Sequence, residues 1–341
     1  MRCAIPFLLL AVGGLSACSG DGDATPEERA LLDVKAYVAG ELGALHQAAL
    51  DLQAAAPEPD TDGWNATDDA AAVTSMREAW KRARLTYERV EGAIAVLFPH
   101  LDASTDERYD GFIAEADDDD LFDGTGVTGV HGIERILWAD VHPPHVVTFE
   151  TALPGYVEAR FPATEAEATA FRDALLGRLV DDTRTMRDDF GPLALDPAAA
   201  FRGVIGSMEE QLEKVTLAAT GEDESRYAQH TLGDMRANLE GGRAIYGAFR
   251  EWVRGEGGAE LDARIVAGFD GIAAQYAMHP EDGIPEVPDG WNPDAPSAEH
   301  LATPYGELWQ LLTEESDPDV DGSLVAEMNA AAETIGIPQL P

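Results

Sequence analysis

Cysteine is almost absent from this chain, which has only Cys3 and Cys18 among its 341 residues. Cys3 lies in a predicted cleavable signal and Cys18 is a predicted lipidation site, so neither is expected as a free thiol or in a disulfide of the mature protein. Cross-links are thereby excluded as a source of stability. The fold must be stabilised by a packed hydrophobic core, and the chain is long enough for two domains.

Positive charge is also scarce. The sequence has 23 Lys and Arg residues against 64 Asp and Glu residues, a formal net charge of −41, and its only lysines are Lys35, Lys81 and Lys214. A surface this acidic repels nucleic acid and anionic lipid headgroups, so neither is an expected partner. It raises the local concentration of cations, which suits a metal-binding protein.

The N-terminus has the pattern of a targeting segment. Arg2 precedes an apolar stretch, residues 4–14, that is too short to span a membrane as a finished helix. This stretch leads into Leu15-Ser16-Ala17-Cys18, the pattern of a bacterial lipobox. We therefore predict a lipoprotein signal peptide at 1–17, lipidation of Cys18 and an acidic tether at 18–25, with a plain secretory signal as the alternative. The expected location is the periplasm or the cell surface, lipid-anchored to a bacterial membrane.

Sustained strand-like alternation is absent, and helical periodicity extends through almost the whole chain. The first helix is predicted to begin at Pro26, followed by Glu27 and Glu28, which are favourable residues at a helix N-terminus. Helices are predicted at 26–57, 70–99, around residue 131, and at 164–190, 197–219, 225–254, 259–278, 305–314 and 323–335. We predict an all-α fold of two antiparallel helical bundles, a duplicated four-helix bundle, with the first at 26–155 and the second at 156–341.

The segment Gly129-Val130-His131-Gly132-Ile133-Glu134 contains a histidine and a glutamate three residues apart in an apolar run. Side chains at this spacing share one face of a helix. An imidazole nitrogen and a carboxylate are the beginning of a site for a divalent or trivalent metal ion. The alternative is a chance polar pair on an ordinary helix, so the motif alone does not establish a site.

Neighbouring acidic residues offer further ligands. Glu88 and Glu91 are again three residues apart on one helix face, and Asp102 and Asp106 lie a short distance beyond them. The alternative interpretation pairs the two glutamates with nearby arginines in surface salt bridges, which contribute little to stability.

A weaker pattern suggests calcium. Asp317, Asp319 and Asp321 resemble the opening of an EF-hand loop. The closing acid, Glu327, stands one position too close to Gly322 for that pattern.

Two groups of segments carry a family resemblance. The first group contains Trp80 to Glu91, Leu101-Asp102, Thr105 to Arg108 and the Gly-x-His-x-x-Glu-x-x-Leu-Trp run; the second contains Lys214 to Tyr227, with Gly221-Glu222-Asp223-Glu224, and Asp234 to Gly241. In this order and spacing they resemble the imelysin-like domain of the EfeO/EfeM family of bacterial Efe-type iron uptake, in its short form without a cupredoxin domain. The resemblance implies a two-bundle helical fold, a periplasmic location and a metal site at the His-x-x-Glu motif.

The resemblance also implies a set of site residues. The expected metal ligands are His131, Glu134, Glu88 and Asp106, followed by Glu91 and Asp102, with Tyr227, His230, Asp234 and Asn238 as secondary candidates. Two residues of the second segment depart from the family pattern, because Thr231 replaces an aspartate and Gly233 replaces a tryptophan.

The function that the resemblance favours is capture of iron, ferrous or ferric, and its delivery to an inner-membrane iron permease that works with a haem peroxidase. Zinc and copper are alternative metals, because imidazole suits them as well. One alternative function is a metallopeptidase-like enzyme, which is disfavoured because no His-Glu-x-x-His motif is present. Another is a protein that binds an acidic polysaccharide through a bridging metal ion.

Overall fold

The computed structural model describes residues 24–65 and 67–338. Its helices are α1 (Pro26–Ala54), α2 (Ala70–Glu88), α3 (Glu91–Leu97), α4 (Pro99–Asp106), α5 (Tyr109–Glu115), α6 (Gly129–Leu137), α7 (Pro144–Glu150), α8 (Glu165–Ala170), the π-helical turn η1 (Phe171–Leu175), α9 (Leu176–Phe190), α10 (Pro197–Leu217), α11 (Thr231–Gly255), α12 (Ala259–Ala277), α13 (Ala298–Leu301), α14 (Pro304–Ser316) and α15 (Leu324–Thr334). These ranges contain no strand, which confirms the predicted all-α helical-bundle fold.

The predicted signal peptide and Cys18 lie outside the described residues. Among the helices that the structure does describe, none is both long enough and apolar enough to cross a membrane.

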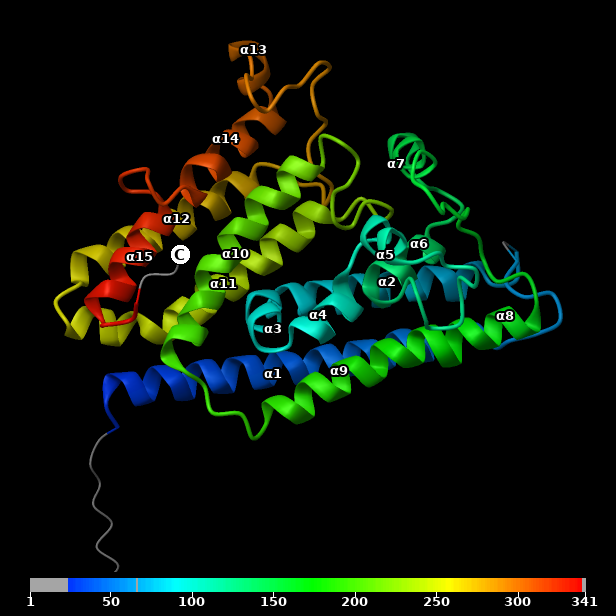
Figure 1. The fold of residues 1–341 in the computed structure, drawn as a ribbon, viewed down its shortest axis with the longest axis horizontal. Helices are drawn as coiled ribbons and strands as arrows, with labels where there is room; N and C mark the ends of the chain where they lie inside the picture. Colours follow the sequence, from blue (N-terminus) through cyan, green and yellow to red (C-terminus); the bar gives the residue numbers. More distant parts are fainter. Residues whose placement is uncertain (1–23, 66, 339–341) are drawn as a thin grey trace, which may run out of the picture.

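Helix α1 contributes to two hydrophobic cores. Its start is fixed by Thr25, whose Oγ1 accepts a hydrogen bond from the Glu28 backbone N–H at 3.1 Å while the Glu28 carboxylate accepts one from the Thr25 N–H at 2.8 Å. Apolar residues from Ala30 to Leu45 pack into the larger core, and Ala49 and Leu52 pack into the second core. The helix therefore connects both parts of the molecule (Figure 1).

The larger core is formed mainly by α10, α11, α12, α14 and α15, and the second by α2, α6, α8, η1, α9 and the end of α1. Helix α9 runs antiparallel along α1 (Figure 1). The second core thus includes Ile133 from before the proline-containing segment at 143–162 and Phe171 from after it. The division into bundles at 26–155 and 156–341, as independent units, stays a prediction.

The structure corrects two predicted helix boundaries. The helix expected at 70–99 is interrupted at Arg89 and Val90, where the Arg89 carbonyl accepts a hydrogen bond from the Tyr37 hydroxyl at 3.2 Å. The helix expected from 225 begins instead at Thr231, because Gln229 has a left-handed backbone with φ 52°. The non-helical residues before Thr231 are those that approach the His-x-x-Glu motif.

A close helix crossing next to the interruption at Arg89 gives a stability prediction. A Cβ atom at Gly241 of α11 would lie 2.2 Å from the Arg89 carbonyl oxygen, whereas a Cβ at Gly247 of the same helix would have no neighbour within 4 Å. We expect Gly241→Ala to lower the free energy of unfolding by about 1–3 kcal/mol through overpacking. Gly247→Ala should raise it by up to about 1 kcal/mol, because alanine is the better helix former. Urea unfolding of both variants measures the change in the free energy of unfolding. Equal changes in the two variants would contradict the close contact between Gly241 and the Arg89 carbonyl.

Candidate metal centre

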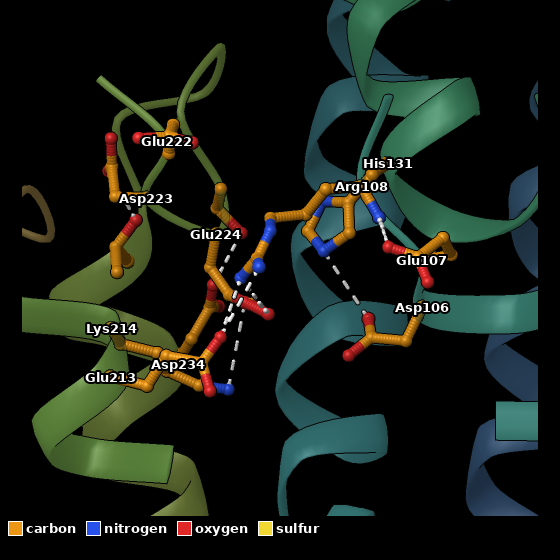
Figure 2. Close-up of polar contacts among 12 residues, drawn as sticks. Asp106, Glu107, Arg108, His131, Glu213, Lys214, Glu222, Asp223, Glu224 and Asp234 are labelled. Carbon is orange, nitrogen blue, oxygen red and sulfur yellow. Dashed lines mark hydrogen bonds and ion pairs between the residues drawn. The ribbon is translucent and has the colours of Figure 1, made fainter. Parts of the chain in front are cut away.

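Three metal-binding side chains converge between α4, α6 and the loop that precedes α11. Asp106 ends α4, His131 lies in α6 and Glu224 lies in the loop, and Figure 2 shows Glu224 facing the other two across the site. One donor atom from each residue lies within 4.8 Å of the other two. His131 is 1% exposed and Glu224 6% exposed. Within residues 24–65 and 67–338 this is the one such group.

The backbone at the start of α6 places His131 beside Asp106. Gly129 has φ 69°, and a Cβ atom there would lie 2.2 Å from the Thr105 carbonyl oxygen. Thr128 Oγ1 also donates a hydrogen bond to the Ser104 carbonyl at 3.0 Å. Glycine is required at this position both for the left-handed backbone and for the close approach. The N-terminus of α6 therefore lies against the C-terminus of α4.

Glu134 holds the imidazole of His131 in position. Its Oε2 lies 3.0 Å from His131 Nδ1, and its Oε1 accepts hydrogen bonds from the backbone N–H groups of Tyr227 at 2.9 Å and Ala228 at 2.7 Å. Both oxygens are thus engaged, and the carboxylate is completely buried. A carboxylate that accepts from Nδ1–H leaves Nε2 as the free electron-pair donor.

Two donor atoms of the trio lack hydrogen bonds. His131 Nε2 lies 3.3 Å from Asp106 Oδ1 without the geometry of a hydrogen bond, and Glu224 Oε2 is buried with no hydrogen-bond partner among the described residues. Buried polar atoms are nearly always satisfied, so two such atoms at one point are unusual. One imidazole and two carboxylates form a donor set that suits iron or another first-row metal ion.

A buried arginine from α2 lies beside the trio. The Arg84 guanidinium contacts Asp106 and Glu88 directly, and it lies 3.3 Å from Asp234 and 3.6 Å from Glu224. Its side chain is completely buried. Four carboxylates from different segments therefore share one guanidinium.

Lys214 of α10 is the second buried cation of the cluster. Its Nζ donates hydrogen bonds to Glu88 at 3.1 Å and to Glu91 at 3.0 Å, and it lies 3.8 Å from Glu224 (Figure 2 shows the approach to Glu224). The lysine is 1% exposed. Burial alone would lower the pKa of its ammonium, but Glu224, Glu88 and Glu91 outweigh this effect and raise the pKa well above its usual value.

The acids of the cluster differ in their pKa values. Burial raises the pKa of Asp106 well above its usual range, although Arg84 acts in the opposite direction. Burial would also raise the pKa of Glu224, but Lys214 and Arg84 outweigh it and hold that pKa below its ordinary value. Burial raises the pKa of Asp102 to about 6 and that of Glu210 to about 8. Asp106, Asp102 and Glu210 therefore bind protons more readily than the same acids would in water, whereas Glu224 binds one less readily.

The structure brings two of the four expected ligands, His131 and Asp106, into the trio. Glu134 contacts His131 but points both oxygens at hydrogen-bond partners. Glu88 is occupied by Arg84 and Lys214. The alternative interpretation paired the glutamates with arginines such as Arg84, and Glu88 does pair with Arg84, but this ion pair is buried and not on the surface. The pair with Lys214 was not expected.

The remaining candidates surround the trio in a polar network. Glu91 accepts hydrogen bonds from Lys214 and Asn238, Asp102 accepts one from the Tyr87 hydroxyl, the Tyr227 hydroxyl donates to Glu150, and Asp234 accepts one from Ser225. His230 is buried just before α11. None of them joins a group of three converging metal-binding side chains within the described parts of the chain.

Sequence reasoning did not select Glu224, although the residue lies in one of the segments that carry the family resemblance. The run Glu222-Asp223-Glu224 looks like a solvated acidic loop, and nothing in its spacing relates it to a histidine 93 residues earlier. Its burial beside His131 depends on how the loop packs.

The aspartates considered for calcium do not converge. Asp319 and Asp321 are exposed, and the Asp317 carboxylate accepts a hydrogen bond from the Asp319 backbone N–H at 2.8 Å. The described residues contain no group of metal-binding side chains at this loop.

Comparisons with known proteins agree with the resemblance. The family model described as Imelysin matches residues 38–311. The chain is 26% identical over 174 residues to the iron uptake system component EfeM of Bacillus subtilis (strain 168), which covers 51% of this chain and 35% of that protein. It is 25% identical over 212 residues to an Efem/EfeO family lipoprotein of Staphylococcus haemolyticus (strain JCSC1435), which covers 62% of this chain and 61% of that protein.

The matched region thus spans less than two thirds of the length of either relative. The family match, by contrast, covers most of this chain and includes all three residues of the trio. The chain therefore belongs to the imelysin family, in the group of imelysin-like EfeO/EfeM proteins.

Proposed function

We propose that this protein is the iron-binding lipoprotein of an Efe-type uptake system, which captures iron and delivers it to an inner-membrane iron permease that works with a haem peroxidase. The observation that carries the proposal is the largely buried trio of Asp106, His131 and Glu224, with two donor atoms that have no hydrogen-bond partner among the described residues. The relatives' names, an iron uptake component and an EfeM/EfeO lipoprotein, support the same role.

Each residue has a distinct task in this proposal. His131 Nε2 and the carboxylates of Asp106 and Glu224 hold the iron as cargo, and imidazole with carboxylate is a donor set that iron accepts. Glu134 orients His131 and fixes which nitrogen carries the proton, as carboxylates commonly do behind metal-bound histidines.

The same geometry disfavours a peptidase. Zinc peptidases use two imidazoles and a glutamate that is free to act as a general base. Here the trio has one imidazole, and Glu134 is held by His131 and by two backbone N–H groups. A role in binding acidic polysaccharide is disfavoured by the net charge of −41, which repels polyanions.

Substitutions in the trio test the site. We expect His131→Ala and Glu224→Gln to abolish tight iron binding, because the first removes the imidazole donor and the second replaces a charged carboxylate with a neutral amide. Glu134→Gln should weaken binding by about 10–100-fold, the usual cost of losing the partner behind a metal-bound histidine. Calorimetric titration with ferrous iron under anaerobic conditions, and with chelated ferric iron, measures these changes.

Matched controls accompany this test. His46→Ala removes another buried histidine, which contacts Thr183 instead of the trio, and should leave the affinity unchanged. Circular dichroism confirms the fold of each variant. Wild-type affinity in a folded His131→Ala protein would refute the site, and peptide cleavage that requires Glu134 would favour the enzyme instead.

Iron binding should depend on pH. Because burial raises the pKa of Asp106, the free protein retains a proton there up to a higher pH than an ordinary carboxyl group would. Iron must displace that proton, so affinity should fall as the pH is lowered and binding should release protons. Titrations in buffers of different ionisation enthalpy, on either side of neutral pH, measure the release. Asp106→Asn should reduce the number of protons released on iron binding. Proton release equal to that of the wild type would contradict the assignment of the released proton to Asp106.

The membrane anchor is tested at Cys18. We expect Cys18→Ala to prevent lipidation, so that the protein is either released into a soluble fraction or left unprocessed. Fractionation with metabolic labelling by a palmitate analogue measures both outcomes. A variant that stays membrane-bound after normal cleavage would show that another feature anchors the chain.

A further inference from the structure

Arg84 contacts carboxylate oxygens that the proposed iron site needs as ligands. Its Nη1 donates a hydrogen bond to Asp106 Oδ1, the same oxygen that lies 3.3 Å from His131 Nε2. Its Nη2 lies 3.6 Å from Glu224 Oε2. Both carboxyl groups of the trio therefore face a guanidinium that competes with a bound cation for their oxygens.

Arg84 also contacts two carboxylates outside the trio. Glu88 pairs with its Nη2 one turn along α2, and Asp234 Oδ2 of α11 lies 3.3 Å from its Nε. Both of these acids are at most 1% exposed. The guanidinium thus has counter-ions on the side away from His131.

The hydrogen bonding of this cluster is incomplete within the described residues. Arg84 Nε and Nη2 are buried close to carboxylates but make no hydrogen bond with acceptable geometry, and Asp234 Oδ1 is buried without a partner. Unsatisfied buried donors beside an unsatisfied acceptor are costly. A modest shift of the guanidinium toward Asp234 would satisfy both.

We propose that Arg84 is the residue that sets the affinity for iron, by acting as an internal counter-cation that gives up Asp106 when iron binds and keeps its pairs with Glu88 and Asp234. The inference rests on the proposed function. An arginine and an iron ion on the same carboxylate repel each other strongly in a buried site. The need to displace Arg84 lowers the affinity and makes captured iron easier to release.

Lys214 has a different role in the same cluster. It makes hydrogen bonds to Glu88 and Glu91 but lies 3.8 Å from Glu224, and it does not contact Asp106 or His131. It can therefore stay in place when Arg84 moves. It continues to neutralise Glu88 and Glu91 in both states.

The first test removes the internal cation. In the full mature protein, Arg84→Gln should bind ferrous iron about tenfold or more tightly than the wild type, because the competing charge is gone. The iron-free variant should melt at a lower temperature, and iron should raise its melting temperature by more than it raises that of the wild type. A purely structural arginine predicts weaker binding instead, so unchanged or weaker binding in a folded Arg84→Gln protein overturns the proposal.

The second test uses Asp234, the proposed fallback acceptor. Asp234→Asn should weaken iron binding in the wild-type background and have no further effect in the Arg84→Gln background, because it acts through Arg84. An equal loss of iron affinity in both backgrounds would mean that Asp234 acts on iron directly. It would overturn the proposal that Arg84 gives up Asp106 and keeps Asp234 when iron binds. If Arg84→Gln fails to fold, Asp234→Asn alone still tests the proposal. Wild-type iron affinity in Asp234→Asn would contradict the fallback role of Asp234.

A matched control removes an arginine elsewhere. The partly exposed Arg250 of α11 pairs with the buried Asp262 of α12 at 2.7 Å, so Arg250→Gln makes the same change of charge away from the site. The iron affinity of Arg250→Gln should equal that of the wild type. A gain in affinity comparable to that of Arg84→Gln would mean that the effect of Arg84→Gln comes from net charge alone. Loss of iron binding in His131→Ala, measured in the same series, separates failure of this inference from failure of the site itself.

Discussion

The structure depends on the balance of charge in one buried cluster. Acids from several segments meet there, and the cost of removing charges from water is several kcal/mol per ion, on the order of the whole stability of a domain. Arg84 and Lys214 offset that cost by contacting Glu88, Glu224 and their neighbours directly. Because these residues come from α2, α10 and the loop before α11, the same contacts fix how helices of the two cores meet.

The charge balance also explains how an acidic protein can be selective about where it holds a cation. A net charge of −41 attracts cations to the whole surface, but exposed acids bind them weakly. The trio combines burial, one imidazole and donor atoms that have no hydrogen-bond partner in the described part of the chain. In the proposed function, the affinity for iron reflects competition between the protein's own cations and the cargo, which suits the proposed capture and release.

Special backbone conformations bring the trio together. Gly129 permits α6 to begin against the end of α4, and the left-handed Gln229 delays the start of α11. That delay leaves the backbone N–H groups of Tyr227 and Ala228 free to bind Glu134. The site is therefore assembled at helix ends and in a loop, where side chains from segments distant in sequence can approach one another.

The sequence by itself determined the helical class, the acidity and the shared face of His131 and Glu134, because all three depend on composition or on spacing within one helix. It also carried enough of the family pattern to indicate a metal site. Only the tertiary structure decided that Glu224 joins the trio, that the backbone of Tyr227 and Ala228 holds Glu134 and that Glu88 pairs with buried Lys214. The physical reason is that periodicity relates residues a few positions apart, whereas these contacts join segments up to 126 residues apart and depend on how helices pack.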